Sequence, residues 1–549
     1  MKKVFYYFCI VCVMCIHTSC KKSLEQIIKQ TEPATFVVYT YDEFGSPAGS
    51  GSGFFIEPSG VGVTNWHVLD KSVKAMIKTS DGKQYEIDSV LCASSKKDIL
   101  VFKVKNETHG TFNTLSFDTE KPAKGAPIYN IGAPMGMESS VSEGIVASYR
   151  EDSHGEIVQT TAPISPGSSG SPLLTDKGKV FAIATFKRRG GENMNFGVVM
   201  DDNFRQELDS KEFYRKNRKF NSEKSDFVLL NILPDKGADL VLNAIEFGST
   251  ATILYLSYTN MHLSDWCLWC ELGKKDSGFY IEDKDTKQRY YVTSSTLATS
   301  KEKASPIELA KVVQFKVYFP VIKNRLSNID VMWGENTRSS HFTNIDLEQY
   351  RQHLSIDDFG YQRACALQYT TESGDLASTI SLLNELLEEN PSDVISLNMM
   401  AILSYAINNN TDAMYYFEEA IDQNPNDELA YINRATLYQT SQNYKAAIED
   451  LTSAINISPK QPDYYWQRAS AYYVLEDYSN ALADINRCLA ISEPEDGFVD
   501  NAYLYELRGY TNYYLQDRKA ARKDCEKAYK LSKDKELDTR LQNFWNLLY

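Results

Sequence analysis

The last third of the chain contains a 34-residue repeat, and no other feature of the sequence restricts the fold as much. Pro391, Pro425 and Pro459 are each 34 residues apart. Small residues at fixed positions allow two antiparallel helices to pack closely, and each proline begins a new unit. A chance bundle of helices would not keep this period. The small and apolar residues that recur in the same order are Ala401, Ala413, Phe417 and Ala420, then Ala435, Ala447, Leu451 and Ala454, then Ala469, Ala481, Ile485 and Cys488, and finally Gly509, Ala521, Cys525 and Ala528.

The period and the positions of its small residues resemble tetratricopeptide repeats. The resemblance implies an all-α solenoid over residues 360–534, with five repeats of which the first is degenerate, and a capping helix at 535–549. It also implies that the first helix of each repeat lines a concave groove that binds a partner protein. The alternative is that the aromatic rings at the groove positions pack the helices together. These rings belong to Trp466, Tyr473, Tyr503, Tyr510 and Tyr513.

The N-terminus has the pattern of a secretory signal. Lys2 and Lys3 precede an apolar run at residues 4–16, which is too short for a transmembrane helix of about 20 residues. Ser19 and Cys20 follow, and this ending resembles a bacterial lipoprotein signal at residues 1–20. The resemblance implies a lipid anchor on Cys20, which attaches the protein to a membrane of the bacterial cell envelope, facing the periplasm or the surface. A plain secretory signal with chance cysteines is the alternative.

Length and charge limit the remaining possibilities. A chain of 549 residues is too long for one hydrophobic core, so we expect several domains. The net charge of −15 argues against a nucleic-acid partner. Cys267 and Cys270 form a C-x-x-C pair without a second pair or a nearby histidine cluster, which is a weak zinc signal. We expect no metal and no cofactor.

Short β-type runs fill the first two thirds of the chain. Residues 34–205 alternate such runs with Gly, Pro and Ser turns, which predicts an antiparallel barrel or sandwich. Residues 206–225 are charged, and we expect a linker there. Strand signals return over 226–346, where the run VVQFKVYF alternates cleanly and residues 282–287 read as a polar hairpin loop. We expect a β-sandwich-like domain in this middle region, without a constellation of chemically active residues.

Three segments of the first domain carry residues that can act together in peptide-bond hydrolysis. His67 follows the run VTNW, Asp98 lies directly before the apolar run ILVF, and Ser169 lies in the turn SPGSSGSPLL. A serine hydroxyl needs a neighbouring base at neutral pH, a histidine can accept its proton, and a buried carboxylate orients the imidazole. Each residue alone has an ordinary structural explanation, as a linker serine, a core histidine or a turn cap. The three contexts together predict a catalytic triad.

The order of these residues and the segments around them resemble the trypsin-like serine proteases, and in particular the HtrA/Deg branch. The matching segments within residues 34–205 are GSGFFI, VTNWHV, DILVFKV, IGAPMG, VSEGIV and PISPGSSGSPLL. The resemblance implies an all-β domain of two barrels. A glycine before the serine can take a backbone angle closed to other residues, so the N–H groups of Gly167 and Ser169 can form an oxyanion hole.

Three departures from that family bear on function. Ser168 stands where pancreatic-type enzymes have an aspartate, so activation by cleavage at the N-terminus is not expected. Ser171 stands where most of the family has glycine, and we expect this small residue to be tolerated. A β-sandwich-like domain and repeats follow the protease domain in place of the usual PDZ domains, which puts the family's PDZ-dependent activation and trimer assembly in doubt.

The segments TAPIS and AIATF offer no carboxylate for a basic side chain. We therefore expect an uncharged substrate pocket with Ile164, Ala184 and Phe186 as its walls. The sequence favours an envelope-anchored serine endopeptidase whose repeats recruit protein substrates or partners. One alternative is a scaffold of repeats that carries a catalytically inert protease fold. A structural lipoprotein of the envelope is the third possibility, and it would explain neither the triad nor the groove.

Overall fold

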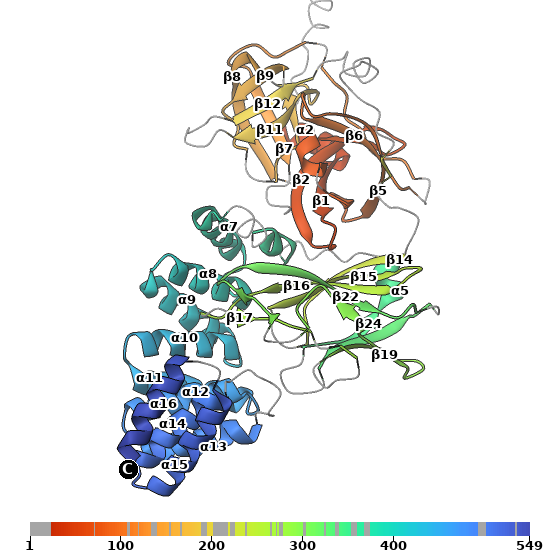
Figure 1. The fold of residues 1–549 in the computed structure, drawn as a ribbon. Coiled ribbons are helices and arrows are strands. Elements are labelled where there is room, and N and C mark those ends of the chain that lie inside the picture. The colour runs from red at the N-terminus through yellow and green to blue at the C-terminus, as the bar shows by residue number, and fades with distance from the viewer. Residues whose placement is uncertain are drawn as a thin grey trace, which may run out of the picture. The chain divides into compact units, whose positions relative to one another are not determined.

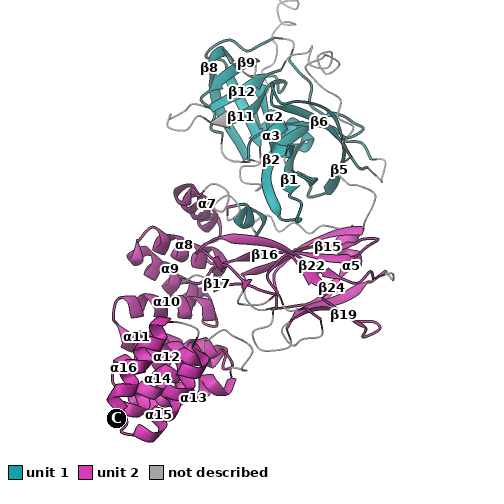
Figure 2. Ribbon diagram, in the orientation of Figure 1, with its two compact units in different colours: residues 1–224, 353–365 teal, residues 225–352, 366–549 magenta. Residues whose placement is uncertain are grey.

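The chain forms two compact units, which Figure 2 shows in different colours. Unit 1 comprises residues 1–224 and 353–365, and unit 2 comprises residues 225–352 and 366–549. The chain therefore leaves unit 1, returns to it for a short segment, and leaves it again. The computed structural model describes residues 23–548 except 71, 107–109, 119, 133–139, 153–154, 165–166, 188–194, 201–217, 220–225, 236–238, 264–265, 271, 274–277, 300–302, 323–324, 335–339, 353–359, 367–373, 492–500 and 533–534.

Unit 1 contains two antiparallel six-stranded barrels (Figure 1). In the first, the order β5-β4-β1-β2-β3-β6 is closed by pairing of β5 with β6, and in the second the closed order is β10-β11-β12-β9-β8-β7. The strands of the first barrel are β1 (Thr35–Tyr41), β2 (Pro47–Glu57), β3 (Val61–Thr64), β4 (Lys74–Thr79), β5 (Gln84–Ser94) and β6 (Ile99–Val104). Those of the second are β7 (Pro127–Gly132), β8 (Ser140–Asp152), β9 (Gly155–Thr160), β10 (Pro172–Thr175), β11 (Val180–Lys187) and β12 (Asn195–Val199).

Each barrel has its own apolar interior, and a third cluster lies between the barrels. Phe55 and Phe102 belong to the interior of the first barrel, and Leu173 and Phe181 to that of the second. The cluster between them combines residues of both, among them Phe54 and Ile183, and also takes in Ile27 of helix α2 (Leu24–Thr31). Burial of these faces on both barrels fixes one barrel against the other, because the apolar area removed from water is large.

Two short segments add to the first barrel. Strand β13 (Arg218–Lys219) pairs with β5. It falls within the predicted linker at 206–225, and the other residues of this linker lie outside the described part of the chain. The helical residues 360–366 mark the point where the predicted repeat region begins, yet 360–365 belong to unit 1. The first helix of the expected degenerate repeat therefore contacts a barrel.

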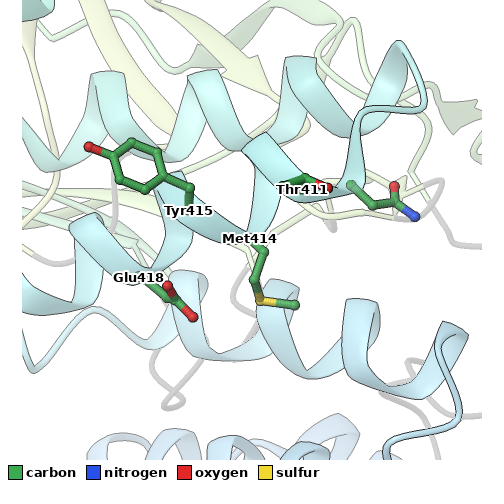
Figure 3. Close-up of a pocket in the computed structure, with 5 residues that line it drawn as sticks. Thr411, Met414, Tyr415 and Glu418 are labelled. Atoms are coloured by element: carbon green, nitrogen blue, oxygen red, sulfur yellow. The ribbon is translucent and has the colours of Figure 1, made fainter.

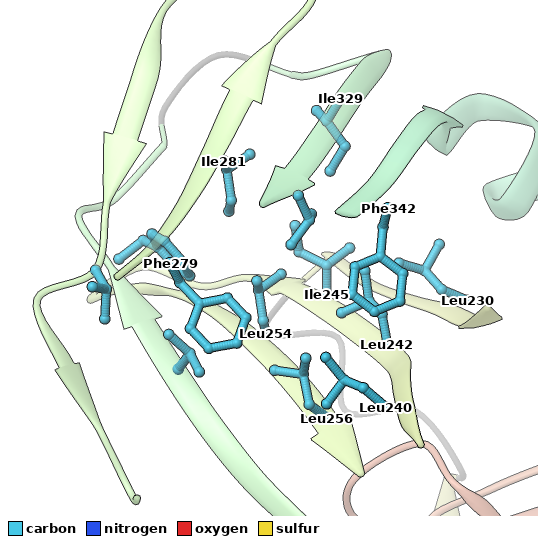
Figure 4. Packing of buried hydrophobic residues seen from close by; sticks show 14 of the residues in the cluster. Leu230, Leu240, Leu242, Ile245, Leu254, Leu256, Phe279, Ile281, Ile329 and Phe342 are labelled. Carbon is cyan, nitrogen blue, oxygen red and sulfur yellow. The ribbon is translucent and has the colours of Figure 1, made fainter. Parts of the chain in front are cut away.

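The β part of unit 2 consists of two main sheets that share one core. Figure 4 shows this core, in which side chains from both sheets interdigitate. The five-stranded sheet has the order β14-β15-β16-β22-β20, the four-stranded sheet β19-β18-β23-β24, and β17 (Trp266–Cys267) pairs with β21 (Pro306–Ile307). The bounds are β14 (Asp226–Ile232), β15 (Leu240–Phe247), β16 (Thr252–Thr259), β18 (Phe279–Asp283), β19 (Arg289–Tyr291), β20 (Ser294–Ser295), β22 (Val312–Phe319), β23 (Asn328–Trp333) and β24 (Ser340–Asp346).

The sequence patterns in this region correspond to observed strands. Along β22, Phe315, Val317 and Phe319 are buried while the residues between them are partly exposed, as alternation requires. The expected hairpin is formed by β18 and β19, with Glu282 and Asp283 in the first strand instead of in the loop. Helix α5 (Leu347–Gln352) follows the last strand.

The helical part of unit 2 is built from antiparallel helix pairs (Figure 1). Its first and last helices are α7 (Leu376–Glu389) and α16 (Lys535–Leu548), and the pairs between them are α8 (Val394–Ala406) with α9 (Asn410–Gln423), α10 (Glu428–Thr440) with α11 (Tyr444–Ile457), α12 (Pro462–Val474) with α13 (Tyr478–Ile491), and α14 (Asn501–Tyr514) with α15 (Arg518–Leu531). We call these helices, α7 to α16, the helical array. The small residues of the period are buried between the helices, as at Ala435 and Ala447.

Turns, caps and ion pairs repeat along the array as regularly as the small residues. Asp393 and Asn443, for example, accept a hydrogen bond from a backbone N–H of the helix that each precedes. Asp450, Asp484 and Asp524 each accept two hydrogen bonds from an arginine 16 residues earlier, namely Arg434, Arg468 and Arg508. A carboxylate that is mostly buried needs such a partner.

The predicted fold class is confirmed: a double-barrel trypsin-like region, a β-sandwich-like middle region and an all-α repeat region follow one another. The predicted signal at 1–20 and its Cys20 lie outside the described residues. Of the helices that the structure does describe, none has both the length and the apolar character that a bilayer crossing requires.

Candidate active site

The residues of the predicted triad come from both barrels. His67 lies in the short helix α3 (Trp66–Leu69), which follows β3 of the first barrel. Asp98 directly precedes β6 of the same barrel. Ser169 lies in the loop before β10 of the second barrel, and we call residues 167–171 the serine loop. Because β3 pairs with β6, the residues at the adjacent ends of these strands are brought together.

His67 and Asp98 form a close pair. The Nδ1 atom of His67 lies 2.8 Å from Oδ2 and 3.0 Å from Oδ1 of Asp98. The backbone N–H of His67 also donates to Oδ1 at 3.0 Å. The carboxylate therefore holds both the ring and the main chain of His67, and it favours the tautomer that carries its proton on Nδ1 and leaves Nε2 free to accept one.

Asp98 itself is held in an uncommon backbone conformation. Its φ is +52°, a left-handed value that aspartate tolerates better than most residues. The side chain of Asn65 fixes this turn by donating to the carbonyl oxygen of Asp98 at 2.7 Å. Burial works to raise the pKa of the Asp98 carboxyl, but the hydrogen bonds and charge of His67, with the Thr185 hydroxyl, outweigh it and hold the pKa below its ordinary value. Asp98 is thus kept ionised beside the histidine.

The serine loop leaves no room for side chains at its glycine after Ser169. Gly170 has a φ of +92°, and a Cβ placed there would lie 2.1 Å from the carbonyl oxygen of Ser52 in β2. The loop is tied to β2 because the backbone N–H of Ser52 donates to the carbonyl of Ser169 at 2.7 Å and the Ser52 hydroxyl donates to that of Gly167 at 2.8 Å. The first barrel therefore positions the loop of the second.

Two backbone donors of the serine loop remain available for an anion. Gly167 has a φ of +88°, so its peptide groups adopt orientations that other residues rarely reach. Neither its N–H nor that of Ser169 donates a hydrogen bond to another residue within the described ranges. These are the two groups that the sequence predicts for an oxyanion hole.

Ser171 stands against a glycine. Its hydroxyl donates to the side-chain carbonyl of Asn130 in the interior, and a Cβ at Gly132 would lie 3.0 Å from the Cβ of Ser171. Because Gly132 has no side chain, there is room for the side chain of Ser171. This explains how a serine is accommodated at this position.

Thr185 of β11 is a member of the site that the sequence analysis did not identify. Its hydroxyl donates to Oδ2 of Asp98, and its backbone carbonyl accepts a hydrogen bond from the Ser169 hydroxyl at 3.2 Å. Within the described residues this is the hydrogen bond that Ser169 Oγ makes, and none joins it to His67. A threonine in the apolar run AIATF was the available signal, since a polar residue in a buried strand needs a partner.

The predicted pocket walls lie in the second barrel. Ile164 and Ala184 are both buried members of its interior cluster, together with Leu173 and Phe181. Phe186 lies in β11, where its backbone is paired with that of Phe196 in β12, and its side chain is outside the described part of the structure. That these residues set the preference for substrates stays a prediction.

The predicted groove residues fall into two groups. Trp466 is 37% exposed, so its ring is open to solvent. Tyr510 and Tyr513 instead pack on Phe544 of α16, with ring centroids 4.0 Å and 6.0 Å apart. The others are Tyr473, whose ring contacts Tyr478 and Tyr514, and Tyr503, which packs against the apolar cluster of α14 to α16.

An open hollow of about 480 Å³ lies on α9 of the helical array (Figure 3). Its lining residues all come from this one helix, and Tyr415 among them is 54% exposed. The sequence analysis placed partner binding on the first helices of the pairs, whereas α9 is a second helix. The other lining residues are Asn410, Thr411, Met414 and Glu418.

The C-x-x-C pair is not part of a metal-binding cluster in the described structure. Cys267 is partly exposed and Cys270 is buried. Across the described ranges, no three His, Cys, Asp or Glu side chains are grouped so that they could hold a metal ion.

Two protein families match separate parts of the chain. Residues 51–183 match the trypsin-like peptidase domain, and residues 295–500 match the ChAPs family (Chs5p-Arf1p-binding proteins). The recognition of a trypsin-like domain followed by a helical repeat region is thereby confirmed. The assignment of these repeats as tetratricopeptide repeats stays a prediction.

Individual relatives cover parts of the chain. "Probable periplasmic serine endoprotease DegP-like" of Pseudomonas savastanoi pv. phaseolicola is 32% identical over 158 residues, which are 28% of this chain and 32% of that protein. "Anti-sigma-I factor RsgI9" of Acetivibrio thermocellus is 26% identical over 311 residues, 55% of this chain and 41% of that protein. The chain thus spans well under half the length of these curated relatives. The crystal structure of Deg5 is 24% identical, with a TM-score of 0.29, and the match covers 33% of this chain and 91% of Deg5.

Proposed function

We propose that this protein is a serine endopeptidase that cleaves peptide bonds in protein substrates, with Ser169 as nucleophile, His67 as general base and Asp98 as the group that orients the base. The observation that carries the proposal is the contact of Asp98 with both the ring and the backbone of His67. No cofactor takes part in this chemistry.

The first step is attack of Ser169 Oγ on the scissile carbonyl carbon. The hydroxyl leaves its hydrogen bond with Thr185 and gives its proton to Nε2 of His67. The imidazolium that forms is stabilised by the ionised carboxylate of Asp98, which stays deprotonated because its pKa is lowered. The carbonyl oxygen becomes negatively charged, and the N–H groups of Gly167 and Ser169 donate to it.

The tetrahedral intermediate then breaks the carbon–nitrogen bond. His67 gives its proton to the leaving amine, and an acyl group remains on Ser169 Oγ. A water molecule attacks the acyl carbon by the same route, with His67 as base, and releases the second product and the free serine. Loss of one oxyanion donor costs about 100-fold or more in rate, so the backbone geometry at Gly167 is as important as the triad.

Labelling with a fluorophosphonate probe tests the proposal directly, because only an activated serine reacts. We expect the full chain to be labelled and to hydrolyse casein. Ser169→Ala should abolish both, and His67→Ala should reduce both by at least about 1,000-fold. Ser168→Ala is the matched control, since it removes a neighbouring serine outside the triad. Full hydrolysis by Ser169→Ala would contradict the assignment.

The second candidate is a scaffold of repeats with an inert protease fold. The hydrogen bond from Ser169 to the Thr185 carbonyl favours it, because a serine held there is not activated. Catalytic hydrogen bonds are often long or misaligned before substrate binds, so this contact is also compatible with an active enzyme. Absence of labelling in the wild-type chain would favour the scaffold.

We further propose that the helical array recruits substrate or partner proteins through a groove that includes Trp466. The family matched by residues 295–500 is named for protein binding, and an exposed tryptophan is a common anchor at interfaces. Trp466→Ala should weaken capture of envelope proteins by the Ser169→Ala variant while the thermal midpoint stays unchanged. Tyr415→Ala, which removes a still more exposed ring on α9, is the control. Equal capture by both variants would place the groove elsewhere.

An anchor at Cys20 and an uncharged pocket complete the proposed function. The relative of Pseudomonas savastanoi is named periplasmic, which agrees with a location in the cell envelope. Cys20→Ser should release the protein from membranes or block its maturation, and stable anchoring requires more than one acyl chain. Peptides with Val, Ala or Leu before the cleaved bond should be better substrates than those with Lys or Arg. The opposite preference would contradict the predicted pocket.

A further inference from the structure

A short segment between the two parts of unit 2 packs on the first barrel. The helical residues 360–366 follow the β part of unit 2 and precede its helical array, yet 360–365 belong to unit 1. We call residues 360–366 the strap. Both ends of the strap continue into unit 2, so the segment connects that unit covalently with the barrel that carries His67.

Tyr361 of the strap occupies a bulge between β1 and β2. In the pairing of these strands Thr40 faces Gly49, whereas the next residue, Tyr41, faces Pro47. The register of the two strands therefore shifts between Thr40 and Tyr41. The shift leaves backbone groups without ladder partners. The Tyr361 hydroxyl accepts from the N–H of Thr40 at 2.8 Å, and it is within donating distance of the carbonyl oxygens of Thr40 and Gly49, the latter 2.7 Å away.

Further contacts hold the strap in place. The Tyr361 ring is 5% exposed and packs edge-on against Tyr39 and Tyr41, with centroids 4.9 Å and 5.6 Å away. The side-chain amide of Gln362 donates to the Ser50 hydroxyl at 3.2 Å. A buried aromatic ring with a satisfied hydroxyl makes this a specific contact.

The same short stretch of β2 contacts the serine loop. Gly49 and Ser50 contact the strap, and Ser52 donates to the carbonyl oxygens of both Gly167 and Ser169. Between them, Gly51 lies so close to the loop that a Cβ there would be 3.1 Å from the Ser169 carbonyl oxygen. These residues span only about 10 Å of extended chain, so a shift of the bulge is transmitted to the peptide groups around Ser169.

We propose that the strap positions the serine loop, with Tyr361 as the positioning residue. The proposal rests on the proposed function of Ser169. With the strap docked, Ser52 keeps the Gly167 and Ser169 peptides oriented for an oxyanion. Without the Tyr361 hydroxyl, the backbone N–H of Thr40 loses the partner that it has in the strap, and the serine loop loses this support.

Tyr361→Phe in the full chain tests this coupling, because it keeps the ring and removes the hydroxyl. We expect fluorophosphonate labelling of Ser169 to slow by about tenfold, since a buried group left without its partner costs this much. For a peptide substrate we expect kcat to fall while KM stays unchanged. Amide hydrogen exchange should become faster over residues 49–52 and 167–171. The matched control is Tyr465→Phe, which removes a tyrosine hydroxyl that donates to the Pro459 carbonyl at 3.0 Å within the helical array.

Unchanged labelling and unchanged exchange at 167–171 in Tyr361→Phe would overturn the proposal. If Tyr361→Phe unfolds unit 1 as a whole, Gln362→Ala serves in its place, with the same changes expected at smaller size, and their absence there is equally decisive. Exchange also separates the two proposals. If the wild-type chain is not labelled at all, the endopeptidase assignment fails, while faster exchange of the serine loop in Tyr361→Phe still supports the strap.

Discussion

In the serine loop, hydrogen bonds join distant residues such as Ser52 and Gly167, which are 115 positions apart. In the helical array, arginine and aspartate side chains that join three of the helix pairs are 16 positions apart, as between Arg468 and Asp484. The first region also contains positive φ angles at Asp98, Gly167 and Gly170, and the second repeats one local arrangement several times. The serine loop is therefore fixed by contacts between residues far apart in the sequence, and the helical array by contacts between residues close together in the sequence.

This difference has consequences for how each region responds to change. A repeat contacts mainly its neighbours, so a defect in one repeat is expected to be partial and local. The serine loop depends on several distant elements at once, and none of them duplicates another. We therefore expect substitutions around Ser169 to act mainly on activity, and substitutions in the array to have graded effects on stability.

The largest expected effect follows from Asp98→Asn. Asparagine tolerates the left-handed backbone of this position, so the fold should be kept. The amide cannot stabilise the imidazolium or select the same tautomer of His67, and kcat should fall by about 10,000-fold. Steady-state kinetics with a peptide substrate, beside thermal unfolding, measure this.

Thr185→Val removes another contact of the same carboxylate, and a smaller loss of activity is expected. It removes the hydroxyl that donates to the Asp98 carboxylate and keeps the backbone carbonyl that contacts Ser169, so a loss of about tenfold is expected. If Asp98→Asn were no more harmful than Thr185→Val, the carboxylate would not be acting through His67.

The second prediction compares two glycines, one from each region. Gly170→Ala places a Cβ 2.1 Å from the backbone oxygen of Ser52 at a φ of +92°, and should destabilise unit 1 by about 4 kcal/mol. Gly509→Ala meets only the edge of the Phe544 ring at 3.1 Å and gains helix propensity. It should change stability by less than about 1 kcal/mol. Urea denaturation measures both, and equal losses would show that the array is as intolerant as the loop.

The sequence was sufficient for features that depend on local pattern. The 34-residue period places the helix pairs because each pair is stabilised by residues of its own repeat, such as Ala435 and Ala447. Alternation along residues 312–319 identifies β22 because one face of the strand is buried. The trypsin-like domain could be recognised from its segments because the residues around His67, Asp98 and Ser169 are short, contiguous motifs.

Features that depend on distant contacts could not be predicted. Thr185 belongs to the site through the bond of its hydroxyl to Asp98, and no spacing in the sequence indicates that pairing. Tyr361 lies in the region assigned to repeats, yet it contacts a bulge about 320 residues earlier, and a bulge leaves no periodic signal. The arginine–aspartate pairs of the array are an intermediate case, since Arg434 and Arg468 recur with the repeat and could have been found.

The third prediction concerns one of these pairs. Arg468 donates twice to Asp484 at 2.8 Å and 2.9 Å, and Asp484 is mostly buried. Arg468→Met keeps the apolar stem and leaves the carboxylate without its partner, which should destabilise the array by about 2 kcal/mol. Casein hydrolysis should be unchanged at a temperature where the array remains folded.

An exposed ion pair provides the control for this effect. Lys83 and Asp81 lie in unit 1 with side chains 68% and 54% exposed, so Lys83→Met should leave stability unchanged within error. If both variants lose the same stability, burial of the carboxylate is not the reason for the loss in Arg468→Met.

The smallest effect is expected from pH, because two shifted groups of unit 2 oppose one another. Burial, reinforced by the carboxylate of Glu428, raises the pKa of Asp239 from 3.8 to about 6. Burial lowers the pKa of His262 from 6.5 to about 4. The stability contributed by Asp239 is complete below pH 3.8 and is lost as the pH rises through 6, whereas that of His262 is complete above pH 6.5 and is lost as the pH falls through 4.

Between pH 6.5 and 4.5 the two contributions therefore change in opposite directions, and the free energy of unfolding of unit 2 should vary by less than about 1 kcal/mol from this pair. The pKa of Asp98 in unit 1 is lowered, so its contribution is lost only below this window.

Asp239→Asn removes one of the opposing groups, and the unfolding free energy of this variant should then decrease by about 1–2 kcal/mol as the pH is lowered from 6.5 to 4.5. Urea denaturation at several pH values measures the slope. If the free energy of unfolding of Asp239→Asn does not change with pH, His262 does not resist protonation in the folded chain. If that of the wild-type chain changes steeply with pH, Asp239 is not the group that compensates for His262.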